Sequence, residues 1–261
     1  MKTKHLLGAI AGIVLGLAGA ANAATLRVTV TNNQPTGGLY LTPFFLAFHD
    51  GSLDFFDLNA FASPAIKALA EEGNTAGLQA QSAGFDTGVV TGPAGFPGAP
   101  VLDPGETASI RLTVNPATGR FLNFASMVIP SNDRFIGNPN PVAYMIFDLL
   151  GHFTNIGPIY VNGDEVWDAG TERSNNIGAA FNAAGGTGTP ERRRIIADPI
   201  MNRVIGQTTL AGDIITSVPE TRHDLVATIT VAPVPLPAAL PVLAGGLGLL
   251  GLFGWRRRQT A

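Results

Sequence analysis

Cysteine is absent from this 261-residue chain, and charged residues make up only 13% of it. Without cysteine the chain can form neither a disulfide nor a thiolate metal site, and it has no cysteine nucleophile. The formal net charge of −3 argues against a nucleic-acid partner, because proteins that bind nucleic acids usually present a basic face. Stability must therefore come from packing, with any bound ion as an addition.

Catalytic signatures are scarce as well. The sequence has neither an H-E-x-x-H zinc motif nor a G-x-S-x-G nucleophile elbow. We expect His49 to be a structural residue beside a glycine turn, and His152 and His223 to lie at the surface. Acid pairs for glycoside hydrolysis could still be drawn from four carboxylates, Asp164, Glu165, Asp168 and Glu172. An enzyme therefore remains the rival interpretation.

Long apolar runs stand at both ends of the chain. Lys2 and Lys4 precede an apolar run, and Ala21-Asn22-Ala23 offers small residues for cleavage, so residues 1–23 are predicted to be a secretory signal. Residues 232–261 form a predicted tail with a Val-Pro-Leu-Pro-Ala motif at 234–238 and an apolar stretch at 238–255. That stretch is at the short limit for a transmembrane helix, and the arginines at 256–258 predict a cytoplasmic end.

Periodicity between the two ends predicts strands. Apolar residues alternate with polar ones over 26–31, 110–114 and 225–231, which is typical of half-buried antiparallel strands. Mostly apolar runs at 41–48, 121–129 and 142–150 are expected to be strands that lie deeper. One helix is expected, with Ser63 as its N-cap, Pro64 at its first position and Gly73 at its end. Val28, Val30, Leu112 and Val114 are predicted to include core residues.

Two acidic loops are the strongest sign of a binding site. Ser131-Asn132-Asp133 opens the first loop, and Asp168-Ala169-Gly170-Thr171-Glu172 forms the second. Three carboxylates in glycine-containing loops suit a hard cation such as calcium, which takes six to eight oxygen ligands. Spacing alone leaves an alternative open, in which Asp133 is a turn former and Asp168 and Glu172 are solvated surface acids.

A family resemblance extends this interpretation. The segment Ser126-Met-Val-Ile-Pro-Ser-Asn-Asp-Arg-Phe-Ile-Gly137, the later Asp168–Glu172 turn and the upstream Ala70–Thr75 stretch resemble the spondin N-terminal domain as found in exported bacterial proteins. The resemblance covers residues 24–231. It implies an all-β fold, an antiparallel C2-like β-sandwich of about eight strands with one short helix. It also implies one Ca²⁺ bound by Asp133, Asp168 and Glu172. Departures are the lack of cysteine, Glu172 where animal members often have aspartate, and Thr113 where some members have an acidic ligand.

The tail resembles a second known element, the PEP-CTERM sorting signal of Gram-negative bacteria, in a variant with Pro-Leu-Pro. That resemblance implies cleavage near 234–238 by an exosortase-type membrane protease. It also implies export across the inner membrane, with the protein at the cell surface or outside the cell after processing. The alternative for the tail is a permanent membrane anchor.

Together these features predict an exported, non-catalytic calcium-binding module of the cell surface or extracellular matrix. The resemblances imply adhesion in a biofilm or exopolysaccharide setting, with exopolysaccharide or surface proteins as partners. The alternative from another class is a secreted hydrolase that acts on surface polymers.

Overall fold

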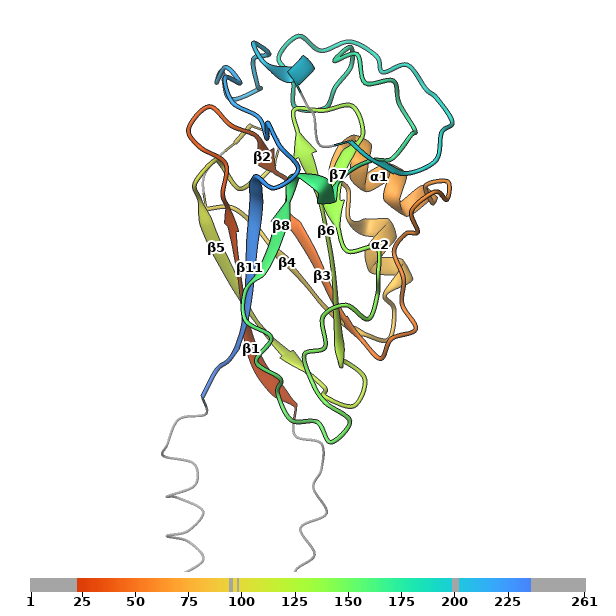
Figure 1. Ribbon diagram of the computed structural model, residues 1–261, viewed down its shortest axis with the longest axis vertical. Coiled ribbons are helices and arrows are strands. Elements are labelled where there is room, and N and C mark those ends of the chain that lie inside the picture. The colour runs from red at the N-terminus through yellow and green to blue at the C-terminus, as the bar shows by residue number, and fades with distance from the viewer. Residues whose placement is uncertain (1–22, 94–95, 98, 199–201, 236–261) are drawn as a thin grey trace, which may run out of the picture.

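The computed structural model describes residues 23–93, 96–97, 99–198 and 202–235, and within them the chain is mostly antiparallel β-sheet. Figure 1 shows the two sheets packed face to face, with two short helices on the outer side of one of them. The strands are β1 (Ala24–Asn32), β2 (Tyr40–Leu41), β3 (Phe44–His49), β4 (Asp86–Val90), β5 (Thr107–Val114), β6 (Phe121–Ile129), β7 (Arg134–Gly137), β8 (Ile159–Asn162), β9 (Val166–Asp168), β10 (Ile196–Ala197) and β11 (Leu225–Pro233). The helices are α1 (Pro64–Glu72) and α2 (Ala76–Gln81), with 3₁₀ turns η1 (Gly163–Glu165) and η2 (Asn202–Val204).

The first sheet has four strands in the order β5-β1-β11-β8, and the second has seven, with β10-β9-β7-β6-β3-β4 in line and β2 paired to β6. Every pairing between these strands is antiparallel. The predicted all-β sandwich is therefore confirmed at the level of two packed antiparallel sheets. The strands outnumber the eight expected because several, such as β2 and β10, are only two residues long.

The alternating segments are strands whose apolar side chains point between the sheets. Along β1, Leu26, Val28 and Val30 are fully buried, while the residues between them are exposed or half-buried. Val114 is also buried, whereas Leu112 is half-buried at the margin of the same cluster. The predicted core residues are thus confirmed, with Leu112 at the edge of the core.

A second apolar cluster lies on the opposite face of the larger sheet, under the helices. It joins Phe45, Phe135 and Trp167 of the sheet to Ile66 and Leu69 of α1. Helix α1 begins as predicted, because the Ser63 hydroxyl accepts a hydrogen bond from the Ile66 backbone N–H, and it ends at Gly73 with φ of +68°. Helix α2 was not predicted. It is short, and its N-cap Thr75 makes no side-chain capping bond, so the sequence signal is weak.

One predicted strand is wrong. The apolar run 142–150 forms only isolated bridges, between Met145 and Phe121 and between Phe147 and Phe153. A turn around Asp148 interrupts the run and leaves Leu149 and Leu150 at the surface instead of in the core.

No helix within the described residues is long and apolar enough to cross a membrane. The transmembrane helix predicted at 238–255 lies outside the described residues, and so do residues 1–22 of the predicted secretory signal.

Truncation in the core should be costly. We expect Val28→Ala to lower the free energy of unfolding by about 2 kcal/mol, because it removes two buried methyl groups and leaves a cavity. Arg27→Ala, at the exposed neighbouring position on β1, should stay within about 0.5 kcal/mol of the parent protein. Urea denaturation of both variants measures the difference, and equal losses would contradict the assigned orientation of β1.

Candidate metal centre

The two acidic loops meet at one end of the larger sheet. Asp133 immediately precedes β7, and Asp168 is the last residue of β9. Because β7 and β9 pair antiparallel, with Arg134 opposite Asp168, the start of β7 lies beside the end of β9. Figure 1 shows the loops that follow β9 gathered at this end of the sandwich, opposite the end where the described chain starts and stops.

Asp133 fastens the second loop to the first. Its carboxylate is fully buried, and Oδ2 accepts hydrogen bonds from the backbone N–H groups of Thr171 at 2.7 Å and Glu172 at 3.0 Å. The Ala169 N–H also donates to the Asp133 carbonyl at 3.0 Å. One carboxylate therefore sets the conformation of the turn that carries the other two acids.

Asn132 forms a second set of hydrogen bonds, to residues further along the loop that follows β9. Its side-chain oxygen accepts bonds from the N–H groups of Asn175 at 3.2 Å and Asn176 at 2.9 Å, and its amide donates to the Ile177 carbonyl at 3.0 Å. The same amide reaches the Glu172 carboxylate at 3.3 Å. The short Asn132-Asp133 segment thus organises residues 169–177, although those residues contain no long strand of their own.

The other oxygen of Asp133 has no hydrogen-bond partner. Oδ1 is buried and unpaired, which is costly for an ionised carboxylate. Burial, and after it the nearby carboxylate of Asp168, raise the pKa of Asp133 to about 6, against the opposing effect of the Thr171 and Glu172 N–H bonds. The site therefore holds negative charge that a cation beside Oδ1 would stabilise.

Asp168 already has one cationic neighbour. Arg134 and Asp168 lie directly opposite one another on β7 and β9, so their side chains share a face of the sheet. The guanidinium Nη2 of Arg134 lies 3.6 Å from Asp168 Oδ2 and also forms a close ion pair with Asp198. Arg134 and Asp168 are both buried, so this is an ion pair largely removed from water.

Glu172 stands apart from the two aspartates. Its half-buried carboxylate contacts Asn132, and burial raises its pKa, with a smaller contribution from Glu71 of α1. Within the described residues, no group of three or more His, Cys, Asp or Glu side chains is arranged to hold a metal ion. The structure therefore couples Asp133 to Asp168 but does not bring Glu172 to the same point.

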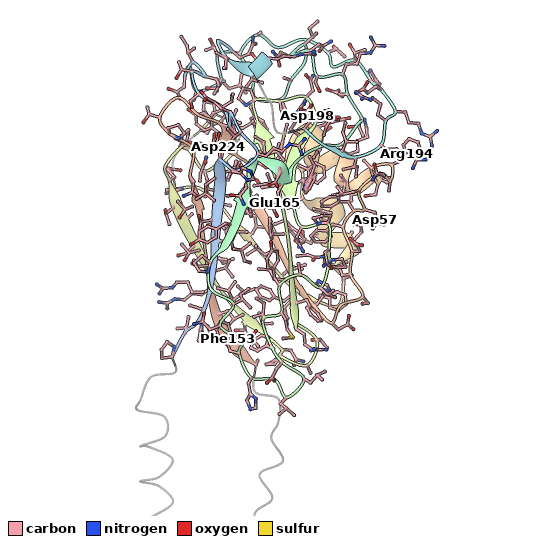
Figure 2. All side chains as sticks on the ribbon, in the orientation of Figure 1. Asp57, Phe153, Glu165, Arg194, Asp198 and Asp224 are labelled. Atoms are coloured by element: carbon pink, nitrogen blue, oxygen red, sulfur yellow. The ribbon has the colours of Figure 1, made fainter. Side chains whose placement is uncertain are left out.

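A polar pocket of about 530 Å³ opens beside the ion pair. Of the three predicted ligands, Asp168 alone is among its lining residues. Charged side chains of both signs dominate the lining: Arg134, Arg173, Arg193, Arg203, Asp168, Glu191 and Asp198. Asp198 lies at this end of the molecule in Figure 2, far from Phe153 at the other end.

The donor set fits calcium in part. The unpaired Oδ1 of Asp133 and the adjacent Asp168 carboxylate are hard oxygen donors, and calcium completes its shell with carbonyls and waters. Against this, Arg134 already neutralises Asp168 and Glu172 points elsewhere. The alternative of solvated surface acids is wrong for Asp168, which is buried, and Glu172 is half-buried. The alternative description of Asp133 as a turn former agrees with its hydrogen bonds.

Sequence reasoning gave no role to two residues of the site, Asn132 and Arg134. Both residues lie within the Ser126–Gly137 motif, so that motif was the only sequence feature that could have indicated their role. The role of Arg134 follows only from the β7–β9 register, which places it opposite Asp168. Asp198, its other partner, lies sixty-four residues further along the chain, and no local pattern connects the two.

The remaining candidates have structural surroundings. His49 is buried, and its Nδ1 accepts hydrogen bonds from the N–H groups of Gly51 and Leu53, as expected for a residue that shapes a turn. His152 and His223 are exposed, as predicted. The exposed arginines 192–194 come just before the edge strand β10, and Arg192 and Arg194 lie over the ring of Phe61.

No family model and no curated protein matches this chain. The likeness to the spondin N-terminal domain therefore rests on the sequence motifs alone.

Proposed function

We propose that this chain is an exported, non-catalytic calcium-binding module of the cell surface or extracellular matrix. The observation that carries the proposal is the carboxylate of Asp133, which is buried beside Asp168 with one oxygen unpaired. An arrangement of this kind favours a bound cation, because burial and the nearby carboxylate of Asp168 both disfavour the negative charge on Asp133. Asp133 and Asp168 are the ligands this geometry supports best, and Glu172 joins them only if its side chain turns away from Asn132.

Export and sorting form the second part of the proposal. Residues 1–23 would direct secretion, and the tail at 232–261 would hold the protein in the inner membrane of a Gram-negative bacterium until an exosortase-type protease acts near 234–238. Polar loops at the far end of the sandwich would then face outward, toward exopolysaccharide or surface proteins. This orientation agrees with an adhesive role for the loop end.

Calcium should stabilise the folded protein. Extracellular modules bind calcium with dissociation constants of about 0.1–1 mM, so 1 mM calcium should add roughly 0.4–1.4 kcal/mol relative to a chelator. A rise in melting temperature, measured by differential scanning fluorimetry, reports this gain. Magnesium should substitute poorly, since it demands a small octahedral shell.

Two variants make the test specific. Asp168→Asn should abolish the calcium response, whereas Asp57→Asn, at an exposed acid away from the site (Figure 2), should leave it intact. If calcium changes neither the melting temperature nor the protease sensitivity of the loops at 131–137 and 168–172, the metal assignment fails. Calcium-dependent turnover of a surface polymer would instead favour the hydrolase.

A further inference from the structure

The largest apolar exposure in the described chain is a two-leucine tip at the end of the molecule opposite the acidic loops. Leu149 is 84% exposed and Leu150 is 81% exposed, which leaves almost the whole of both side chains in solvent. We call residues 147–153 the leucine turn. The same stretch of chain carries further exposed apolar side chains: Val142, Met145 and Ile156.

The leucine turn is built to hold this shape. Asp148 Oδ1 accepts hydrogen bonds from the N–H groups of Leu150 and His152, each at 2.8 Å, and the Gly151 N–H donates to the Asp148 carbonyl at 3.1 Å. At its base Phe147 is buried and bridges to Phe153, with ring centroids 6.1 Å apart. A fixed turn thus presents two leucines outward, where an unstructured loop could fold them back onto the protein.

The turn lies at the end of the sandwich where the described chain begins and stops. Gly151 packs close to Pro116, which follows β5, and Val114 at the end of β5 pairs with Ala24. The next pairs along β1 join Leu26 to Pro233 at the end of β11. In Figure 1 the green loops of this region lie beside the ends of β1 and β11, and in Figure 2 Phe153 marks the same end.

The tether to the predicted membrane helix is short. The Val234 N–H donates to the Thr25 carbonyl at 2.8 Å, so the chain is fastened to the sandwich up to residue 234. The predicted apolar helix begins at residue 238. Four residue steps of extended chain span at most about 14 Å. Any bilayer that holds residues 238–255 must therefore lie next to this end of the domain and next to the leucine turn.

We infer that the leucine turn docks on the lipid bilayer and inserts Leu149 and Leu150 at the boundary between headgroups and acyl chains. This inference rests on the membrane-anchored state of the proposed function. Apolar side chains on a rigid tip are suited to that boundary, which accepts apolar surface to a depth of about 5–10 Å. Docking at a second point, beside the predicted helix, fixes the tilt of the domain and keeps Val234 close to the membrane surface.

The test uses the full chain with single cysteine labels, which are unique because the sequence contains no cysteine. An environment-sensitive fluorophore is attached at Leu149→Cys or, as the matched control, at Leu210→Cys, an exposed leucine in the loops that precede β11 at the other end. Each protein is reconstituted in vesicles of phosphatidylethanolamine and phosphatidylglycerol, with and without spin-labelled lipid. We expect a blue shift and roughly threefold stronger lipid quenching at position 149 than at position 210.

Three outcomes would overturn the inference, and they separate it from the anchor on which it rests. If the full chain fails to float with the vesicles, the predicted anchor is wrong and the docking falls with it. Flotation with equal quenching at positions 149 and 210 leaves the anchor in place and removes the docking alone. A blue shift at 149 that spin-labelled lipid does not quench would assign the leucine turn to contact with a second copy of the chain.

Discussion

Arg134→Ala should lower the free energy of unfolding by about 3–5 kcal/mol, the cost of removing one partner from a buried ion pair. Arg134 is buried between Asp168 and Asp198, and its Nη1 also donates to the Ser174 hydroxyl at 2.8 Å. Without the guanidinium, the buried carboxylate of Asp168 would lie near Asp133 without its cationic partner. Urea denaturation followed by circular dichroism, in the presence of a chelator, measures the loss.

A second substitution tests whether the loss comes from unpaired charge or from missing packing. Combining Arg134→Ala with Asp168→Asn removes the stranded carboxylate, so the double variant should recover more than half of the lost stability. Lys67→Ala is the control for an ion pair at the surface. Lys67 is half exposed and pairs with Glu71 one helical turn away, so its loss should be at most about 0.5 kcal/mol. A double variant as unstable as Arg134→Ala alone would refute the electrostatic explanation.

Calcium provides a further readout of the same variant. If the ion binds between Asp133 and Asp168, it should stabilise Arg134→Ala more than the parent protein, because it replaces the missing positive charge. The calcium-induced rise in melting temperature should therefore be larger for the variant. An unchanged or smaller rise would place any bound calcium away from Asp168.

The fold could be predicted from the sequence to a greater extent than the site. The strands β1, β5 and β11 were predictable because one face of each is more buried than the other, so apolar and polar residues alternate along most of their length. Helix α1 was predictable because Ser63, Pro64 and Gly73 mark its ends through local chemistry. The run at 142–150 has the apolar composition of a buried strand, but the hydrogen bonds of Asp148 bend the chain into a surface turn.

The site shows the opposite limit. The motif located Asp133, Asp168 and Glu172 in neighbouring loops, yet the direction of each side chain depends on contacts between distant residues. The direction of the Glu172 side chain is set by its hydrogen bond to Asn132. The direction of the Asp168 side chain is set by the strand register, which places it opposite Arg134. Such pairings are tertiary, so spacing along the chain carries no information about them.

The second large effect concerns the pH dependence of the metal-free protein. The pKa of Asp133 is about 6 in the folded state, above its ordinary value of 3.8. The folded protein therefore binds a proton at Asp133 more tightly than the unfolded chain does. This protonation stabilises the fold below pH 4, and the stabilisation is lost as the pH rises to 6. At neutral pH the loss amounts to up to about 3 kcal/mol.

Asp133→Asn isolates that contribution. Asparagine keeps a side-chain oxygen that can accept the N–H groups of Thr171 and Glu172, but it carries no charge. In a chelator at pH 7 the variant should therefore be more stable than the parent protein, by up to about 3 kcal/mol. At pH 4 the difference should shrink to about 0.6 kcal/mol or less, since Asp133 is then largely protonated in the folded parent. Subtracting the two stability curves removes the contributions of other acids, such as Glu165, whose pKa is also raised by burial.

The same variant separates a metal ligand from a structural acid. If Asp133 is a metal ligand, Asp133→Asn should be more stable than the parent without calcium and should also lose the calcium response. Both effects follow because the charge on Asp133 destabilises the metal-free protein and would bind the ion. The parent protein would then gain on adding calcium at pH 7 and gain little at pH 4, where protons compete for Asp133. If Asp133→Asn is less stable than the parent at pH 7 in chelator, the ionised carboxylate is stabilised by its N–H partners alone. Asp133 would then serve only to fasten the 169–177 loop.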